Sequence, residues 1–179
     1  RPGRHALLPS LTPQQQVALL CRVLHREGYN DHIAGHITLR QEDGTYLANP
    51  WELTWAEVKA SDILQLDAQG KIIEGEWNIT PAINLHIDVH SARHDVSVVI
   101  HNHSEWGSVW SAVGRVPPIY DQTSALVDTD PVYYDEYRGT VEDSELGRAA
   151  ADALGQHKWA LLANHGVLVV ANGIRQAHL

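Results

Sequence analysis

The chain is poor in the features that mark secreted and membrane proteins. Its 179 residues include a single cysteine, Cys21, and no apolar run of membrane-spanning length. One thiol cannot form an internal disulfide, and a spanning helix needs about 20 apolar residues. No long apolar stretch follows residues 1–4, as a secretory signal would require. We therefore expect a cytoplasmic protein without a membrane partner, in which Cys21 is a buried structural thiol. Because the chain contains no Met, and hence no initiator, we also expect it to belong to a longer product.

Basic residues are scarce. Thirteen Lys and Arg stand against 22 Asp and Glu, which gives a formal net charge of -9 and a pI near 5.7. No cluster of Lys or Arg offsets this surplus, so we expect no nucleic-acid partner. With 44% hydrophobic and 20% charged residues, a chain of this length fits one globular domain that covers residues 1–179.

Helix and strand signals alternate along the chain. Thr12-Pro13 and Thr80-Pro81 are typical of helix starts, and Asp43-Gly44 is a turn signal between two alternating segments. Helices are predicted at about 13–27, 81–94, 105–112 and 143–154. Strands are predicted at about 33–39, 45–48, 96–100, 159–163 and 167–171. The sequence therefore predicts an α/β fold, with one sheet and helices packed against it.

Three histidines follow two of these strands. His101 and His103 come directly after the apolar run 96–100, and His165 follows the apolar run 160–163. Side chains two apart in a strand point to the same side, as two ligands of one ion must. Imidazole suits zinc, iron, copper or nickel, and three protein ligands with an open position are typical of catalytic sites. In a chain with 12 histidines a His-x-His pair can arise by chance, so the third histidine strengthens the hypothesis of a metal site.

Two further pairs of histidines are spaced four residues apart. His86 and His90 lie on a predicted helix, and His32 and His36 lie in a predicted loop and strand. Histidines four apart on a helix can bind one metal, whereas that spacing does not converge in a loop and strand, and satisfied or surface histidines are the commoner outcome in both cases. We interpret these four as structural or surface histidines and not as metal ligands.

The order of several motifs resembles the class II aldolase and adducin family, closest to its adducin-like branch. The motifs are Gly35-His36-Ile37-Thr38, Leu85-His86, Ala92-Arg93-His94-Asp95-Val96, His101-Asn102-His103-Ser104, Tyr134 to Gly139 and Asn164-His165-Gly166. The resemblance covers nearly the whole chain from about residue 13. It implies a three-layer α/β fold, with a central and mainly antiparallel sheet of nine or a similar number of strands flanked by helices.

The resemblance also implies a site and an assembly. It makes His101, His103 and His165 the ligands of a divalent metal, with zinc favoured and iron or manganese as alternatives. It implies a homotetramer with the active site at a subunit interface. The final helix is expected to be incomplete at Leu179, because it continues in family members and contributes to the neighbouring site.

Departures from the family pattern bear on the substrate. The sugar-phosphate aldolases carry a catalytic Glu where this chain has Ala82, and a methyl group cannot move a proton. In the segments with which those enzymes bind phosphate, Pro81 removes an amide donor and Glu52 would repel a phosphate. We expect an unphosphorylated small-molecule substrate.

Other residues are assigned roles by their placement in the sequence. Asp121 falls where the aldolases carry an active-site Tyr from the next subunit, so Asp121 with adjacent Tyr120 is the predicted catalytic pair; an ordinary turn aspartate is the alternative. The predicted substrate-binding residues are His36, Asn49, Trp51 and Glu105. Trp51, with Trp106, could form a flat apolar wall, or both could simply fill core or subunit contacts.

Three functions are compatible with these residues. The first is a metal-dependent carbon–carbon lyase, aldolase-like and in particular a decarboxylase, acting on a hydroxy or keto acid that could be aromatic; loss of carbon dioxide needs no base at position 82. The second is a non-haem iron oxygenase of secondary metabolism, because a three-histidine iron site leaves positions open to oxygen. The third is a non-catalytic, adducin-like interaction module. The three histidines count against the third, since a scaffold needs no converging ligands.

Overall fold

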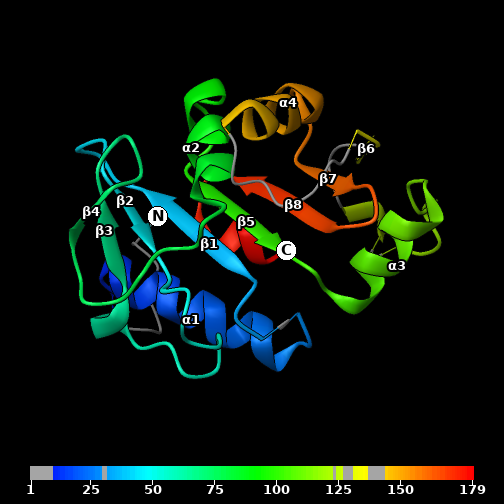
Figure 1. The fold of residues 1–179 in the computed structure, drawn as a ribbon. Coiled ribbons are helices and arrows are strands. Elements are labelled where there is room, and N and C mark those ends of the chain that lie inside the picture. Colours follow the sequence, from blue (N-terminus) through cyan, green and yellow to red (C-terminus); the bar gives the residue numbers. More distant parts are fainter. Residues whose placement is uncertain (1–9, 30–31, 123, 127–130, 137–143) are drawn as a thin grey trace, which may run out of the picture.

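The computed structural model describes residues 10–29, 32–122, 124–126, 131–136 and 144–179. One sheet lies between two groups of helices (Figure 1). The helices are α1 (Pro13–Arg26), α2 (Ile83–Ala92), α3 (Glu105–Val113), α4 (Ser144–Leu154) and α5 (Ile174–His178), with 3-10 turns η1 (Ala60–Asp62) and η2 (Ser124–Leu126). The strands are β1 (His36–Arg40), β2 (Tyr46–Ala48), β3 (Leu64–Leu66), β4 (Ile72–Glu74), β5 (Val98–Asn102), β6 (Val132–Tyr134), β7 (Trp159–Leu162) and β8 (Gly166–Ala171).

The sheet has eight strands among the described residues, in the order β4-β3-β2-β1-β5-β8-β7-β6. Neighbouring strands are antiparallel except β6 and β7, which run parallel. The sheet is therefore mixed but mainly antiparallel, and it has eight described strands where nine or a similar number were expected. The parallel pair forms because α4 lies between β6 and β7 in the chain and returns it to the same end of the sheet.

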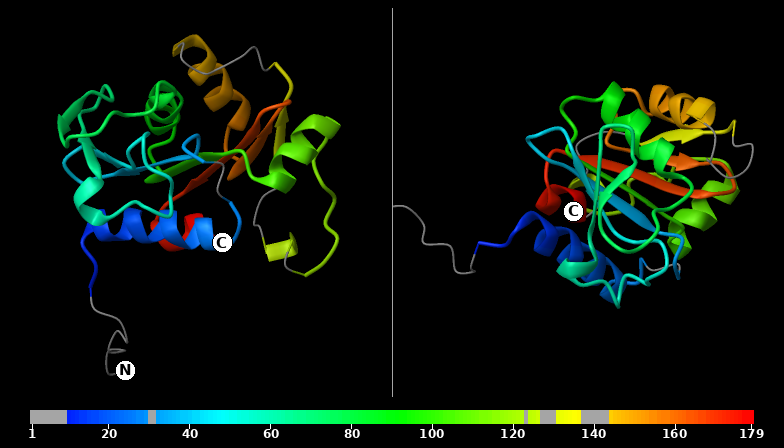
Figure 2. Two further views of the ribbon diagram at one scale, coloured as in Figure 1. Left: turned by 60° about the horizontal axis from the view of Figure 1, so that its bottom comes forward. Right: turned by 60° about the vertical axis from the view of Figure 1, so that its left-hand side comes forward.

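Helices cover both faces of the sheet. Figure 2 (left) shows α1 and α5 on one side and α2 and α4 on the other. The first face buries a core cluster that includes Leu20, Ile37, Trp55 and Ile100. The second buries Leu85, Val89, Leu154, Leu162 and Leu168. Central strands of a sheet covered on both faces carry apolar residues on both sides, as β5 and β7 do.

Most local signals of the sequence are confirmed. The Thr12 hydroxyl accepts the Gln15 N–H at 3.2 Å, and the Gln15 side chain accepts the Thr12 N–H at 2.9 Å, which forms a capping box. Gly44, at φ +85°, makes the turn between β1 and β2. Helix α2 begins at Ile83, two residues after the predicted Pro81. Asp143, the expected start of α4, and residues 137–139 of the Tyr134 to Gly139 motif lie outside the described residues.

The motif Arg93-His94-Asp95 has a structural role. Arg93 binds the Asp95 carboxylate through two nitrogens at 2.7 and 2.8 Å. The same guanidinium donates to the carbonyl oxygens of Gly155 and His157. It therefore ties the end of α2 to the loop between α4 and β7, next to the strands that carry the histidines.

Cys21 is buried on α1, as expected, and burial raises the pKa of its thiol well above the usual value. Within the described part of the chain, no helix combines the length and apolar character needed to cross a membrane.

Candidate metal centre

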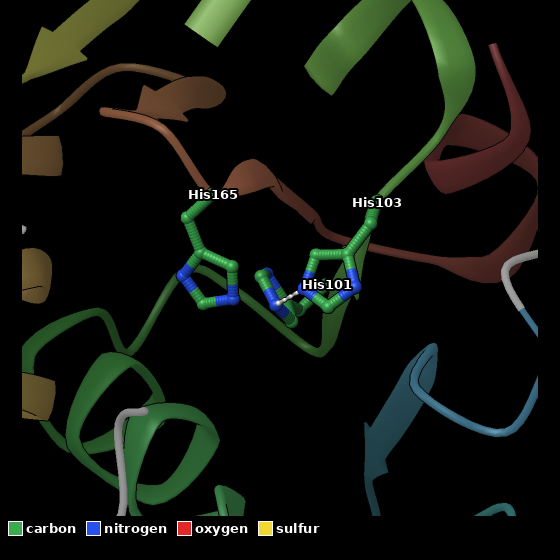
Figure 3. Close-up of side chains that lie close together, drawn as sticks. All are labelled: His101, His103 and His165. Atoms are coloured by element: carbon green, nitrogen blue, oxygen red, sulfur yellow. Dashed lines mark hydrogen bonds between the residues drawn. The ribbon is translucent and has the colours of Figure 1, made fainter. Parts of the chain in front are cut away.

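The three histidines of the predicted metal site lie together. His101 is in β5, His103 follows that strand, and His165 is in the turn between β7 and β8. One ring nitrogen from each lies within 4.8 Å of the others, and the Nε2 atoms of His101 and His103 are 3.0 Å apart. Figure 3 shows the three rings facing one another. The convergence inferred from spacing is thus present in the structure.

The turn that contains His165 depends on the two residues that flank this histidine. Asn164 adopts φ +53°, a left-handed conformation that Asn tolerates better than most residues. At Gly166, a Cβ atom would lie 2.4 Å from the Asn102 carbonyl oxygen and 2.7 Å from Cδ2 of His103. Only glycine therefore allows β8 to start this close to the end of β5. This close approach gives a physical reason for the Asn-His-Gly motif.

The backbone fixes the orientation of the His101 ring. Its Nδ1 lies 3.0 Å from the carbonyl oxygen of Val167, which can only accept, so Nδ1 carries the hydrogen. The lone pair of Nε2 then points into the cluster. Burial, followed by the nearby His36, His165 and His103, lowers the pKa of His101 well below its usual value. A neutral, oriented imidazole is the form that binds a metal, so the donor set fits a divalent ion.

Behind the three histidines lies a buried chain of polar side chains that the sequence analysis did not predict. His36 contacts His101, with ring centroids 4.9 Å apart. The Nδ1 of His36 is 2.6 Å from Nε2 of His86, and the Thr38 hydroxyl lies 2.9 Å from Nδ1 of His86 and 2.8 Å from Nε2 of His90. His86 and His90 are fully buried, and each forms hydrogen bonds within this group of side chains. This agrees with the interpretation of both as structural histidines.

Burial keeps the three histidines among these buried polar side chains uncharged. It is the largest cause of the low pKa of His36 and His86, which lie well below the usual value, and it lowers the pKa of His90 to about 3. The sequence feature that could have revealed these buried polar side chains is the presence of His36 and Thr38 on the same face of one strand. Their partners on α2 lie about 50 residues away, and only the fold brings them together.

A pocket of about 190 Å³ opens onto the histidine cluster. It is lined by Ala34, His36, Trp51, Thr80, Pro81, Ala82, Leu85, His101, His103 and His165. These lining residues include no carboxylate, lysine or arginine. Ala82 is among the lining residues and presents only a methyl group to the pocket.

Two of the four predicted substrate-binding residues, His36 and Trp51, line this pocket. Asn49 does not: its Oδ1 accepts the Ile37 N–H at 2.7 Å and its Nδ2 donates to the Gly35 carbonyl at 3.3 Å. It therefore holds the backbone on either side of His36. Glu52 also lies outside the lining and binds the Asn78 backbone and side chain. Glu52 is therefore not placed to repel a phosphate in the pocket, as was expected. The lining residues nevertheless include no lysine or arginine that could bind one.

The remaining predicted residues lie outside the pocket of this chain. Glu105 is the exposed first residue of α3, and Tyr120 is 70% exposed. Asp121 is exposed, and its Oδ1 accepts the Ser124 N–H at 2.7 Å, as in a local turn. Any catalytic role of these three would require a neighbouring subunit, and it stays a prediction.

The pattern of the class II aldolase and adducin N-terminal domain matches residues 15–179. The chain therefore belongs to the class II aldolase and adducin family. The solved structure of an aldolase II superfamily protein from Pseudomonas syringae has the same fold, with a TM-score of 0.81 at 27% identity, covering 94% of this chain and 70% of that one.

Two of the curated relatives are named for reactions other than aldol cleavage. One is a 4-hydroxy-3-prenylphenylpyruvate oxygenase/4-hydroxy-3-prenylbenzoate synthase of Streptomyces roseochromogenus subsp. oscitans, 32% identical over 165 residues, with 89% of this chain and 60% of that protein covered. The other is decarboxylase NovR of Streptomyces niveus, also 32% identical over 165 residues, with 89% and 61% covered. The chain thus spans about three fifths of the length of these relatives.

Proposed function

We propose that the protein is a metal-dependent carbon–carbon lyase that decarboxylates an unphosphorylated aromatic acid. The observation that carries the proposal is the composition of the pocket: three convergent imidazoles and an apolar wall, with no carboxylate among the lining residues. Aldol cleavage needs a base to remove a hydroxyl proton, whereas loss of carbon dioxide does not. With Ala82 at the pocket, decarboxylation is the reaction that these residues support best.

His101, His103 and His165 would hold the metal, with zinc favoured and iron or manganese as alternatives. A divalent ion bound there would polarise a substrate oxygen and stabilise the charge that develops when a carbon–carbon bond breaks. The balanced step is simplest for a 3-keto acid. The bond to the carboxylate breaks, carbon dioxide leaves, and the electron pair remains as an enolate, which then takes up one proton.

The pocket suits a small aromatic acid. A cavity of roughly 150 Å³ lined by apolar side chains can hold a benzene ring, and this pocket measures about 190 Å³. Trp51 would supply a flat wall for such a ring, and His36, which also lines the pocket, would contact the carboxylate. A phosphate dianion would find no lysine or arginine in the lining. The relative from Streptomyces roseochromogenus is named for a prenylated phenylpyruvate, which supports an acid of this class, and the relative from Streptomyces niveus is named a decarboxylase, which supports the reaction.

The assembly we propose is a homotetramer with the site at a subunit interface. Helix α3 exposes a row of apolar residues at helical spacing: Trp106 is 70%, Val109 46% and Val113 53% exposed. Ile119 and Tyr120 are also exposed, at 68% and 70%, and the centroid of the Tyr120 ring lies 6.3 Å from that of Trp110 in α3. Exposed apolar residues of this number favour burial against another subunit. Across that contact Asp121, with Tyr120 or Glu105, would return the proton to the product carbon. A cytoplasmic location is part of the same proposal.

A second candidate function is a non-haem iron oxygenase. It is favoured by the name of the relative from Streptomyces roseochromogenus and by the all-imidazole donor set, which also suits iron. The two reactions differ in one measurable quantity, the uptake of oxygen.

The test incubates benzoylacetate, an aromatic 3-keto acid, with protein loaded with zinc or with iron under air. We expect carbon dioxide release above the spontaneous rate without oxygen uptake, and loss of that excess in His103→Ala. Oxygen uptake with the iron form alone would favour the oxygenase. Cleavage of fuculose or ribulose 1-phosphate at roughly 1 per second or faster would contradict the exclusion of sugar phosphates.

A further inference from the structure

Helix α3 begins two residues after the metal ligand His103 and lies beside β7 and β8, the two strands joined by the turn with His165 (Figure 1). The residues that it turns toward these strands are small. Ser104, Gly107 and Ser111 lie three and four residues apart, so they share one face, and both serines are buried. The helix therefore approaches the sheet with its backbone rather than with long side chains.

Gly107 is the point at which α3 contacts β8. A Cβ atom at this position would lie 2.3 Å from Cγ2 of Val167 and 2.7 Å from the hydroxyl oxygen of Ser104. Val167 has a stiff, β-branched side chain, and its backbone is paired with β5 on one side and with β7 on the other. Its carbonyl oxygen accepts the Nδ1–H of His101. Gly107 thus sets the distance between α3 and the residue that orients the first ligand.

The first turn of α3 holds the second ligand, His103. The Ser104 N–H donates to Oδ1 of Asn102 over 3.2 Å, so a side chain from β5 closes a turn around His103. The Ser108 N–H donates to the Ser104 carbonyl at 2.8 Å and continues this turn into the helix. A displacement of α3 would therefore move the backbone on the helical side of His103.

The last turn of α3 holds the loop of the third ligand. The carbonyl oxygen of Ser111 accepts the Asn164 N–H at 3.2 Å and the Tyr133 hydroxyl at 3.1 Å. Asn164 directly precedes His165, and Tyr133 lies in β6. Ser111 is among the last four residues of the helix, whose carbonyl groups lack partners within the helix. This end of α3 is therefore tied to the turn that contains His165.

We propose that α3 positions all three metal ligands and that Gly107 is the positioning residue that fixes its distance from the sheet. A side chain at position 107 must displace one of two elements. If Val167 moves, the acceptor of the His101 ring moves with it. If α3 moves, the supports of His103 and His165 move. The role toward a metal rests on the proposed function, whereas the orientation of the rings can be measured without metal.

The test exchanges volume between the two positions in contact. Gly107→Ala adds a methyl group, and the double variant Gly107→Ala/Val167→Ala makes room for it while keeping the carbonyl of residue 167. We expect Gly107→Ala to bind zinc roughly tenfold more weakly, as for disturbed support of a ligand, and the double variant to recover most of the affinity. Alanine favours a helix over glycine by about 1 kcal/mol, so a weakened helix would not explain the loss. Gly173→Ala is the control, because its Cβ would meet nothing within 4 Å.

A second measurement needs no metal. The same proteins are treated with chelator and compared by ¹⁵N NMR of labelled histidines, with each ligand assigned by the loss of its signals on substitution by Gln. We expect the His101 hydrogen on Nδ1 in the parent, the control and the double variant. In Gly107→Ala, displacement of Val167 should divide that hydrogen between both nitrogens, whereas displacement of α3 should shift the signals of His103 and His165.

Three results would overturn the positioning role. They are zinc affinity of Gly107→Ala equal to that of the control, no recovery in the double variant, and signals of all three histidines in Gly107→Ala identical to those of the parent. If Gly107→Ala does not fold, the double variant decides, because it must then fold and bind zinc as the parent does. A parent that binds no zinc would contradict the proposed metal centre, while the NMR comparison would still decide whether Gly107 positions the histidines.

Discussion

The Nδ1–H of His101 donates to the carbonyl oxygen of Val167 over 3.0 Å. Because that bond occupies one ring nitrogen, the other is held toward His103, 3.0 Å away. The pairing of β5 with β8 places Val167 opposite Asn102, so the sheet itself orients the first ligand. Backbone pairing therefore preorganises His101 as a ligand.

From this follows a prediction on metal content. Purified protein should contain about one divalent ion per chain, because three imidazoles converge with an open fourth position. His103→Ala should lose most of it, since two ligands hold an ion much more weakly than three. His94→Ala is the control, because His94 is exposed and outside the cluster. Elemental analysis of the three proteins makes the comparison; equal content in all of them would contradict the site.

A second prediction concerns Gly166. In Gly166→Ala the new Cβ must displace the Asn102 carbonyl or the His103 ring, so metal affinity should fall by at least tenfold and thermal stability should decrease. Gly173→Ala is the matched control, because its Cβ would meet nothing within 4 Å and its backbone is extended. Zinc titration and thermal unfolding measure both effects. A Gly166→Ala protein with the affinity of the control would show that the turn does not constrain the ligands.

The third prediction is acid destabilisation. Burial lowers the pKa of His90 from 6.5 to about 3, so between these values the unfolded chain binds a proton that the folded chain does not. The stabilisation is complete above pH 6.5 and is lost as the pH falls toward 3. Each such histidine changes the free energy of unfolding by about 1.4 kcal/mol per pH unit in that range. His36 and His86 shift in the same direction.

Urea unfolding of chelator-treated protein at several pH values tests this, because removing the metal separates the effect from metal release. His90→Gln should reduce the slope by roughly the contribution of one proton. A free energy of unfolding that stays constant between about pH 7 and 5 would show that these histidines are not buried and neutral.

The fourth prediction addresses Asp121. If it acts across a subunit interface, Asp121→Asn should lower turnover by roughly 100-fold or more while metal stays bound. Asparagine can still accept the Ser124 N–H, so the local turn should persist. Asp43→Asn is the control, because Asp43 makes a similar bond to the Thr45 N–H in the hairpin. Full activity in Asp121→Asn would transfer the role of proton donor to Tyr120 or Glu105, whereas full activity in a monomer at micromolar concentration would contradict a role for any of the three.

The sequence by itself determined the local features. The Thr12 cap and the Asp43-Gly44 turn depend on neighbours within a few residues, and their signals were sufficient. His101 and His103 could also be paired from sequence, because strand alternation is a local property. Placing His165 beside them required only that two strand ends meet.

Only the tertiary structure decided the rest. The path from His36 to His90 crosses from β1 to α2, and no local pattern shows which helical residues face which strand residues. The parallel pairing of β6 with β7 depends on the return of the chain through α4. The close approach that requires Gly166 depends on the contact between β8 and β5. In each case the deciding contact joins segments far apart in sequence, where packing rather than local preference selects the partner.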